Sequence, residues 1–531
     1  MENISPSNPI QQAFLTTKDM LSLACLIGFY LLFRIFLARH FAFFDPDEAL
    51  EMLVAQTLMH GEIPFVDAYS HRGPMLTLVY AGGLMIGGEF SFAGIQLIAL
   101  AMFSFTLTIL YGAVRNSFGS PAAFYSAALV VLLATLAFPR ADIWALNSDY
   151  LLALWTTLGM SVLLIGAADP LPRATSPLCF FGGFLLAVGF LTKQNGIFFA
   201  FAPLVVFMSK GLRKFLILST IYGAGFLVPT LLCLGFFLFI GEWERFWFLF
   251  YEYNSNYATL SVVNSLSDRI ALFSWALEKQ WLLFLAPLVL LILWLAGRRT
   301  DIKLGLPALL ILAWAAAGLI SAAAPGRAWE NYLWATIFPF SVAAGTSLAL
   351  LTRICQRMLD PVGKRKTAIA AILLAGYAMC FVPTIVSAIP YLQMVRLQKG
   401  DRVGGITRPR NISRRELIEV IRTNSIPDDY IYISGYAPEI YILAKRRAAS
   451  RHAVSNFVEN FYPGSDLPSR LDPVLTKELL ADLDRNRPRL IIDGAVLGFF
   501  APPDSALGPV LMQYAQDNHY ITLQEGVYRS D

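Results

Sequence analysis

FFDPDEALEMLVAQTLMHGEIPFVDAYSHRGP, residues 43–74, joins the first long apolar run of the chain to the next one. Three carboxylates, Asp45, Asp47 and Glu48, stand where the first run ends, and the basic sequence HRGP closes the stretch. A charge inside the hydrocarbon core of a membrane is costly, so charges gather in the connections between spans. We therefore expect this stretch to lie at a membrane surface, where its charges need a structural partner or a ligand.

The composition is that of a membrane protein. The chain has 531 residues, of which 56% are hydrophobic and 15% charged, whereas soluble domains carry about 25% charged residues. Apolar runs recur along the chain, each long enough to cross a hydrocarbon core of about 30 Å. The net charge of +4 is too small to suggest a nucleic acid as partner. The sequence predicts a polytopic α-helical membrane protein.

Hydropathy predicts about eleven spans, within a range of about ten to thirteen. Two amphipathic stretches, 47–60 and 75–88, fit helices that lie at the interface in the first outer loop rather than crossings. The predicted spans are 19–39, 90–114, 120–138, 149–167, 177–192, 195–209, 215–240, 271–296, 304–323, 331–351 and 367–388.

Lysine and arginine segregate to alternate connections, as the positive-inside rule requires. This pattern places the N-terminus in the cytoplasm and the first loop, with its carboxylates, on the outer face. The inside connections are 115–120, 169–176, 210–214, 297–303 and 353–366.

The composition changes after Pro390, where charged and polar residues alternate with short apolar runs such as YIYISGY (430–436) and RLIIDGA (489–495). Helix-like segments separate these runs, which indicates a small α/β domain. We expect a transmembrane catalytic domain over 1–389 and a soluble domain over 390–531. The parity of the spans places the soluble domain on the outer face.

The carboxylates of the first loop have more than one explanation. Asp45 can cap the helix that begins near Pro46. Asp47 and Glu48, partly desolvated beside cations, also suit a general base that deprotonates a hydroxyl. The two can instead hold a divalent cation such as Mg²⁺ or Mn²⁺, although two carboxylates without further ligands are weak grounds for a metal site.

Two basic residues of the outer connections also have two explanations each. Arg72 can anchor the chain at headgroup depth, or its planar fork of donors can bind a phosphate. Lys193, in LTKQNG (191–196), lies between two short apolar stretches. Lys193 can extend its ammonium to the interface. An ammonium near or slightly below the outer membrane surface, however, favours pairing with an anion. We favour a phosphate-binding role for both.

Polar side chains at two further outer turns extend the candidate set. Asp149 opens a predicted span and can act as a helix cap. Arg327 and Tyr332 share a turn with tryptophans that are typical of an interfacial belt. Arg327 adds another cation to a face otherwise rich in carboxylates. The other candidates for lining a shared cavity are Asp45, His71, Gln194 and Asn331.

Cations beside carboxylates at the membrane edge call for an anionic ligand that is itself embedded in the membrane. A lipid phosphate meets this requirement. Such an arrangement suits displacement at the anomeric carbon of a sugar with the lipid phosphate as leaving group. The cations would stabilise the charge that develops on the phosphate, and a carboxylate would take the acceptor proton.

Four motifs, in their order and on their common face, resemble those of the C-type (GT-C fold) membrane glycosyltransferases that use polyprenyl-phosphate sugars. This superfamily includes protein O-mannosyltransferases, the lipid A aminoarabinose transferase and rhizobial galacturonosyltransferases. The resemblance covers about residues 20–350. Its motifs are Asp47-Glu48, Arg72-Gly73-Pro74, Leu191-Thr192-Lys193, and Gly326-Arg327 followed by Tyr332 and Pro339.

The resemblance implies a GT-C fold and an inverting transfer of one hexosyl or pentosyl unit to an acceptor hydroxyl at the outer face of a bacterial inner membrane. The acceptor would be an envelope glycan such as lipopolysaccharide, a lipid or a protein. The implied roles are Asp47 as base with Glu48 in support, Asp149 as a second acidic residue, and Arg72, Lys193, Arg327 and Tyr332 on the donor phosphate.

Three other functions fit parts of the pattern. A transporter or flippase for a lipid-linked sugar would also need cations on one face, but such folds carry internal repeats with broken helices. An oligosaccharide ligase or polymerase would move a glycan block instead of one sugar. A non-catalytic scaffold would merely present the outer domain.

Overall fold

The computed structural model describes ten segments of the chain. They are 15–40, 46–137, 145–168, 172–259, 285–296, 304–326, 330–358, 414–461, 469–497 and 504–530.

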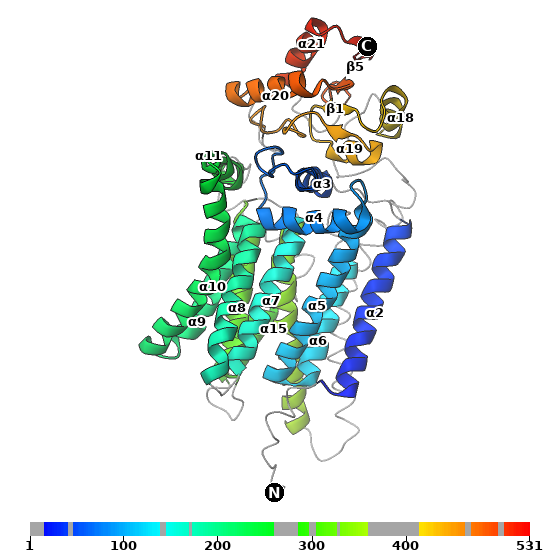
Figure 1. Cartoon of the computed structure of the whole chain (residues 1–531). Coiled ribbons are helices and arrows are strands. Elements are labelled where there is room, and N and C mark those ends of the chain that lie inside the picture. The colour runs from blue at the N-terminus through cyan, green and yellow to red at the C-terminus, as the bar shows by residue number, and fades with distance from the viewer. Residues whose placement is uncertain are drawn as a thin grey trace.

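A bundle of long apolar helices forms the body of the protein (Figure 1). Five described helical segments are long and apolar enough to cross a membrane: α5, α7, α10, α14 and residues Asn331–Ile354, which include most of α15. The helices of the bundle are α2 (Thr17–His40), α5 (Phe92–Phe118), α6 (Ser120–Leu132), α7 (Ser148–Ala168), α8 (Pro172–Thr192), α9 (Ala202–Met208), α10 (Leu212–Phe239), Leu285–Ala296, α14 (Gly305–Ala323) and α15 (Trp334–Met358).

Short helical turns extend or join the long helices. A π-helical turn, η1 (Leu133–Ala137), continues α6, and a 3₁₀ helix, η3 (Gln194–Phe201), leads from α8 into α9. A second 3₁₀ turn, η5 (Glu330–Leu333), precedes α15. Beyond α10 the chain forms α11 (Trp243–Trp247), a π-helical turn η4 (Phe248–Glu252) and α12 (Tyr253–Thr259).

Two helices lie across one end of this bundle. Figure 1 shows α4 (Pro74–Gly87) across the end of the bundle, with α3 (Pro46–Met59) above it. The sequence predicted interfacial helices over nearly the same residues, and this is confirmed. We expected α3 to be amphipathic, with one face in water, but its residues 48–57 are all buried. The reason is that α4 packs against it and α19 (Pro438–Ala444), from the C-terminal part of the chain, also contacts it.

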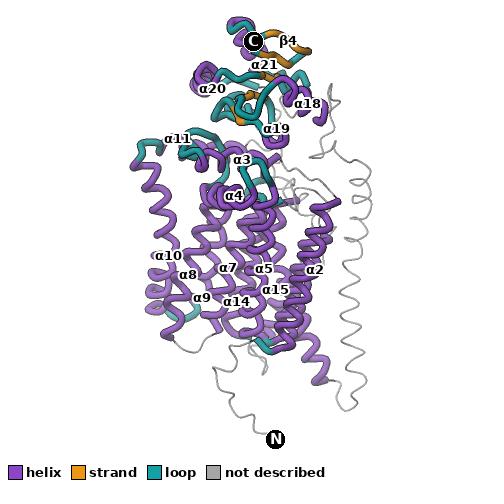
Figure 2. The backbone as a smooth tube through the Cα atoms, turned by 45° about the vertical axis from the view of Figure 1, so that its right-hand side comes forward, coloured by secondary structure: helices purple, strands orange, loops and turns teal. Residues whose placement is uncertain are grey.

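The described residues of the C-terminal part, 414–461, 469–497 and 504–530, form a small α/β unit above α3 and α4 (Figure 2), called the outer domain for its place beyond one end of the bundle. Its sheet has the strand order β2-β1-β3-β5-β4. Strand β1 runs parallel to β2 and β3, and β5 runs antiparallel to β3 and β4. The strands are β1 (Tyr430–Ile433), β2 (Arg447–Ala448), β3 (Leu490–Ile492), β4 (Ile521–Gln524) and β5 (Val527–Arg529), and the helices are α18 (Arg414–Asn424), α19 (Pro438–Ala444), α20 (Pro473–Asn486) and α21 (Leu507–Asp517).

The predicted spans agree with the helices wherever the structure describes them, usually to within a few residues. The predicted span 367–388 and residues 271–284 lie outside the described residues. At the end of the bundle away from α3 and α4, the guanidinium of Arg353 donates to the Phe118 carbonyl at 2.9 Å. Lys210 follows α9 at the same end. The described basic residues Arg115, Lys210 and Arg353 therefore lie at the end of the bundle opposite the outer domain, as their alternation along the sequence indicated.

The HRGP turn docks directly on the end of α8. The Gly73 amide donates to the Thr192 carbonyl at 3.0 Å. A Cβ atom built on Gly73 would lie 1.9 Å from the Leu191 carbonyl oxygen, which is far inside van der Waals contact. Glycine is required at this position because two backbones touch there.

We expect Gly73→Ala to lower the free energy of unfolding by about 1–3 kcal/mol, because the new methyl group must push the two turns apart. Thermal unfolding in detergent measures the effect. Gly82→Ala, in α4, is the matched control, because its Cβ would meet its nearest atom, Ile98 Cδ1, at 3.6 Å. Equal stability of the two variants would contradict the close docking of Gly73.

Candidate active site

The centre of the site is the buried guanidinium of Arg72. Its Nη2 lies 2.5 Å from Oδ2 of Asp47, and its Nη1 lies 3.3 Å from Oε1 of Glu51. Asp47 and Glu51 stand four residues apart on α3, so both project from one side of the helix. Ser70 also donates to Glu51 Oε1 at 2.5 Å. Arg72 is thus held between two carboxylates of the same helix.

The outer domain reaches this centre through Tyr436. Its hydroxyl donates to Oδ1 of Asp47, across 389 positions of sequence. Asp47 therefore receives a hydrogen bond on one carboxylate oxygen and an ion pair on the other. Its side chain is 35% exposed, so a ligand can still approach it.

A second cluster forms around Lys193, directly after α8. Its Nζ donates to Oδ2 of Asp149 at 2.6 Å, and Asn331 donates to the same oxygen at 2.8 Å. The ammonium also lies 4.5 Å from the ring centroid of Tyr332, in a cation–π contact. Four residues predicted from three distant outer turns therefore meet in one place.

Backbone contacts join the two clusters. The side-chain amide of Gln194 donates to the His71 carbonyl at 3.1 Å, and Asn254 donates to the same carbonyl at 2.6 Å. The rings of Tyr253 and Phe457 pack against the imidazole of His71. The turn that carries Arg72 is therefore fixed against the turn that carries Lys193.

The charged groups around Arg72 shift the pKa values of Asp47 and His71. Burial alone would raise the pKa of Asp47, but Arg72, the Tyr436 hydroxyl and His71 together hold it below its usual range. Burial and the positive charges of Arg72 and Lys193 lower the pKa of His71 to about 3, against the opposing effect of Asp47. At neutral pH the site therefore combines an ionised Asp47 with a neutral His71.

Glu48 lies in a different network from its neighbour Asp47. Its Oε1 accepts hydrogen bonds from the Leu146 amide at 2.7 Å and from Gln96 at 3.1 Å. Burial raises its pKa to about 7, although the Leu146 amide, Arg34 and Gln96 act in the opposite direction. Glu48 ties α3 to the segment that leads into α7, and Asp149 stands in the first turn of that helix. Glu48 thereby helps to fix the position of Asp149.

The structure brings together most of the side chains that the sequence singled out, and it adds others. Asp45 and Arg327 lie outside the described residues. Glu51 was not among the predicted site residues, although its spacing from Asp47 on one helix was a usable signal. Asn254 and Tyr436 were not predicted either, and the sequence offers no signal for them, because only the fold brings them to the site.

Asp47 and Glu48 belong to two separate hydrogen-bond networks. Their carboxylates turn to different partners, and no group of three or more His, Cys, Asp or Glu side chains within the described segments is spaced to hold a metal ion.

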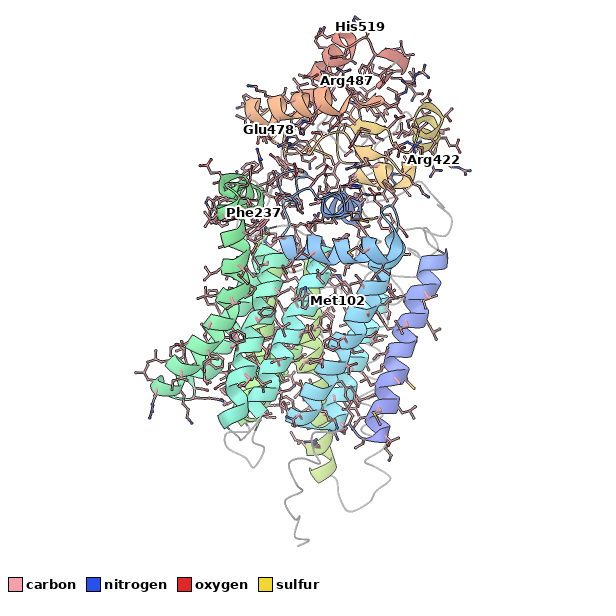
Figure 3. The ribbon with its side chains drawn as sticks, in the orientation of Figure 1. Met102, Phe237, Arg422, Glu478, Arg487 and His519 are labelled. Carbon is pink, nitrogen blue, oxygen red and sulfur yellow. The ribbon has the colours of Figure 1, made fainter. Side chains whose placement is uncertain are left out.

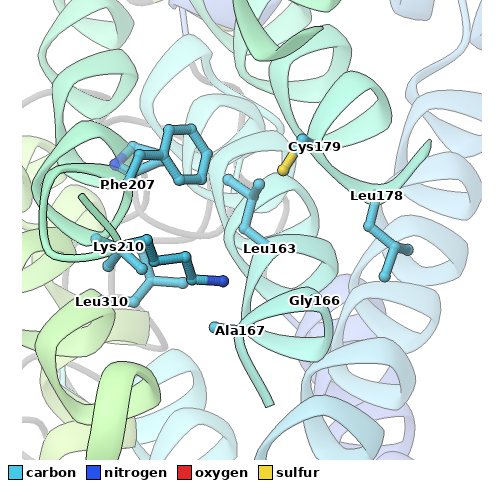
Figure 4. A pocket seen from close by; sticks show the side chains of 10 residues that line it. Leu163, Gly166, Ala167, Leu178, Cys179, Phe207, Lys210 and Leu310 are labelled. Carbon is cyan, nitrogen blue, oxygen red and sulfur yellow. The ribbon is translucent and has the colours of Figure 1, made fainter. Parts of the chain in front are cut away.

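A small apolar crevice lies between helices of the bundle (Figure 4). Leu163, Cys179, Phe207 and Leu310 line it, and Lys210 reaches over it. Asp149 begins α7 and Gly166 nears its end, so about 17 residues of helix, or roughly 25 Å, separate the crevice from the charged site. The crevice belongs to a different surface of the protein.

Ionic contacts seat the outer domain over the charged site. Glu478 of α20, labelled in Figure 3 at the edge of the outer domain, accepts from Tyr69 and from Arg245, both at 2.8 Å. The Tyr69 amide donates to the Arg451 carbonyl at 2.9 Å. These contacts join the outer domain to the first loop and to α11, so the domain forms a fixed cover.

Comparison with known proteins gives one match to a family model and several matches to solved structures. The model of the dolichyl-phosphate-mannose-protein mannosyltransferase family matches residues 71–239, from HRGP to the end of α10. No curated protein sequence matches the chain.

Two solved structures represent the structural matches. The archaeal oligosaccharyltransferase AglB from Archaeoglobus fulgidus, in complex with an inhibitory peptide and a dolichol-phosphate, has a TM-score of 0.52 at 13% identity, covering 90% of this chain and 69% of that chain. ArnT from Cupriavidus metallidurans in the apo state has a TM-score of 0.52 at 14% identity, covering 94% of this chain and 97% of that chain. The chain has the GT-C fold, as its motifs predicted.

We expect Glu48→Ala to destabilise the protein by about 1–3 kcal/mol, because it leaves the Leu146 amide and Gln96 without their acceptor. Glu48→Gln should unfold close to wild type, since it keeps an oxygen in the same place. Thermal unfolding of both variants in detergent measures the difference. If Glu48→Gln were as unstable as Glu48→Ala, the negative charge and not the acceptor oxygen would be what Glu48 contributes.

Proposed function

We propose that the chain is an inverting membrane glycosyltransferase that moves one sugar from a polyprenyl-phosphate donor to an acceptor hydroxyl. The observation that carries this proposal is the convergence of Arg72, Lys193 and Asp47 at one end of an apolar bundle. Two cations at the membrane edge suit the phosphate of a lipid whose chain lies in the bilayer. A carboxylate beside them suits an acceptor that arrives from water.

The proposed reaction is a single displacement. The acceptor oxygen attacks the anomeric carbon, and its proton passes to Asp47. The bond between the anomeric carbon and the phosphate oxygen breaks, and its electron pair stays on the lipid phosphate. Arg72 and Lys193 stabilise that developing charge. One displacement inverts the configuration at the anomeric carbon.

Each cation is already paired within the protein, and this pairing favours the proposed role. Arg72 carries five N–H donors in a planar fork, so it can bind a phosphate while its carboxylates hold it in place. Lys193 has three N–H donors, one of which is directed at Asp149. The carboxylates Glu51 and Asp149 thus preorganise the donor site, and Tyr332 supports the ammonium from its ring face. We extend the same phosphate-binding role to Arg327.

Transfer of one sugar, hexosyl or pentosyl, is favoured over transfer of a glycan block. The matching family model is named for a mannosyltransferase that uses dolichyl-phosphate-mannose. The match with this chain covers 97% of ArnT but 69% of the oligosaccharyltransferase. A larger part of the oligosaccharyltransferase therefore has no counterpart in this chain. The oligosaccharyltransferase is described with a dolichol-phosphate, a lipid phosphate of the kind proposed for this site.

We place the protein in a bacterial inner membrane, with the N-terminus cytoplasmic and the outer domain, expected over residues 390–531, periplasmic. The basic connections around Arg115, Lys210 and Arg353 lie at the bundle end away from the outer domain, which agrees with the positive-inside rule. The acceptor would then be an envelope glycan such as lipopolysaccharide, a lipid or a protein.

We expect Asp47→Asn to lower the transfer rate by about 10²–10⁴-fold, the usual contribution of a general base. Asparagine keeps the shape of the side chain and an oxygen that can accept from Arg72, and Glu51 remains as an ionic partner, so the protein should still fold, with a lower unfolding temperature because one buried ion pair is lost. The assay uses purified protein in detergent or liposomes, a polyprenyl-phosphate sugar and a hydroxyl acceptor, and it measures glycosylated product. Undiminished turnover by Asp47→Asn would refute the role of Asp47.

The same assay separates transfer from transport. A flippase for a lipid-linked sugar would move the intact donor across the liposome membrane and release no polyprenyl phosphate. Stoichiometric release of polyprenyl phosphate with formation of glycosylated product supports a transferase. Movement of uncleaved donor without product would overturn the proposal.

We expect Lys193→Gln to raise the KM for the lipid donor by about 10–100-fold, because a hydrogen bond to a charged phosphate is lost. Glutamine can still donate to Asp149, which limits damage to the fold. The KM for the acceptor should change less than the KM for the donor. Lys210→Gln, at the opposite end of the bundle, is the matched control and should leave both constants unchanged. Equal rises in both KM values for Lys193→Gln would argue against a phosphate role.

A further inference from the structure

The contact between Tyr436 and Asp47 links the outer domain to the chemistry of the bundle. We infer that Tyr436 is a positioning residue that fixes the carboxylate of Asp47 for proton transfer, so that the outer domain completes the active site. This inference rests on the function proposed above. It assigns a part in the reaction to a domain that could otherwise serve only as a cover.

The turn that carries Tyr436 is rigidly held. It lies between β1 and α19, and Gly435 at its centre adopts a φ of 86°, a conformation that favours glycine. The Gly435 amide donates to the Ser455 hydroxyl at 2.9 Å, and its carbonyl accepts from the Ser455 amide at 3.2 Å. The preceding Ser434 is bonded through its amide to the Ile492 carbonyl at 2.9 Å. The tyrosine is therefore presented from a fixed backbone.

The outer domain does not need Tyr436 in order to stay in place. Its seat is provided by Glu478 on Tyr69 and Arg245, by Arg447 at 3.7 Å from Glu62, and by the packing of α19 on α3. These contacts are independent of the Tyr436 hydroxyl. Removing that hydroxyl should therefore leave the domain seated and change only the support of Asp47.

Two donors fix a carboxylate where one does not. The ion pair with Arg72 holds one oxygen of Asp47, and the group could still rotate about its side-chain bonds. The Tyr436 hydroxyl, from the turn between β1 and α19, donates to the second oxygen. The two contacts together set the plane of the carboxylate. A base acts efficiently only when its oxygen is aimed at the proton to be removed, so misplacement lowers the rate of the chemical step.

The test is Tyr436→Phe in the full-length protein, assayed with a polyprenyl-phosphate sugar and a hydroxyl acceptor. We expect kcat to fall by about 10–100-fold, as for the loss of a hydrogen bond to a charged group. The KM values for donor and acceptor should stay within about twofold of wild type, because the groups proposed to bind the phosphate are unchanged. A role in folding alone would not produce this separation of kcat from KM.

The matched control is Tyr430→Phe, the same change in strand β1 of the same domain. The ring of Tyr430 lies 5.2 Å from the guanidinium of Arg447, and phenylalanine retains that face. This variant should keep wild-type kcat. Limited proteolysis of both variants checks that the outer domain remains seated, and thermal unfolding checks the fold.

Each outcome decides the inference. A selective fall in kcat for Tyr436→Phe, with a seated domain and a normal control, supports it. Wild-type kcat in Tyr436→Phe overturns it, as does an equal loss in Tyr430→Phe or an effect confined to the donor KM. Failure of the proposed function is recognised separately, because the wild-type protein itself would then form no product.

Discussion

The buried guanidinium of Arg72 is the constraint on which the site depends. A charge removed from water is tolerated only when it is paired and hydrogen-bonded. Asp47 and Glu51 meet that requirement from one face of α3, and the close contact at Gly73 holds the arginine turn against the end of α8. The pairing therefore sets the distance between α3 and the bundle. The same contacts place a cation, a carboxylate and the turn of Lys193 around one point.

The enclosure of α3 follows from this arrangement. A helix lying at an interface normally keeps one polar face in water, yet residues 48–57 of α3 are buried on all sides. The outer domain covers the face that α4 does not. Because α3 carries Glu48 and Glu51, the cover excludes water from these two carboxylates and strengthens their electrostatic interactions, whereas Asp47 stays partly exposed. The outer domain is in this respect part of the site's environment as well as a source of Tyr436.

Glu48 and Glu51 show how neighbouring carboxylates acquire different tasks. Glu48 fixes the segment before α7 through the Leu146 amide. Glu51 instead pairs with Arg72 and accepts a hydrogen bond from Ser70. Burial raises the pKa of both carboxyls. Asp47 is the carboxylate of this helix that combines an ion pair with an exposed surface, which is why the proposed chemistry centres on it.

The sequence by itself determined the membrane class, most span positions, the two crosswise helices and the α/β character of the C-terminal part. These features follow from hydropathy and from residue periodicity, which are local properties. It also indicated Asp47, Arg72, Asp149 and Lys193, because charges near apolar runs are conspicuous. The tertiary structure alone decided that Glu51 and Tyr436, and not Glu48, join Asp47 and Arg72. The spacing of Asp47 and Glu51 indicates that both lie on one side of a helix. Which residue they meet there, and where a domain almost 400 residues away packs, depend on contacts between distant parts of the chain that no local pattern encodes.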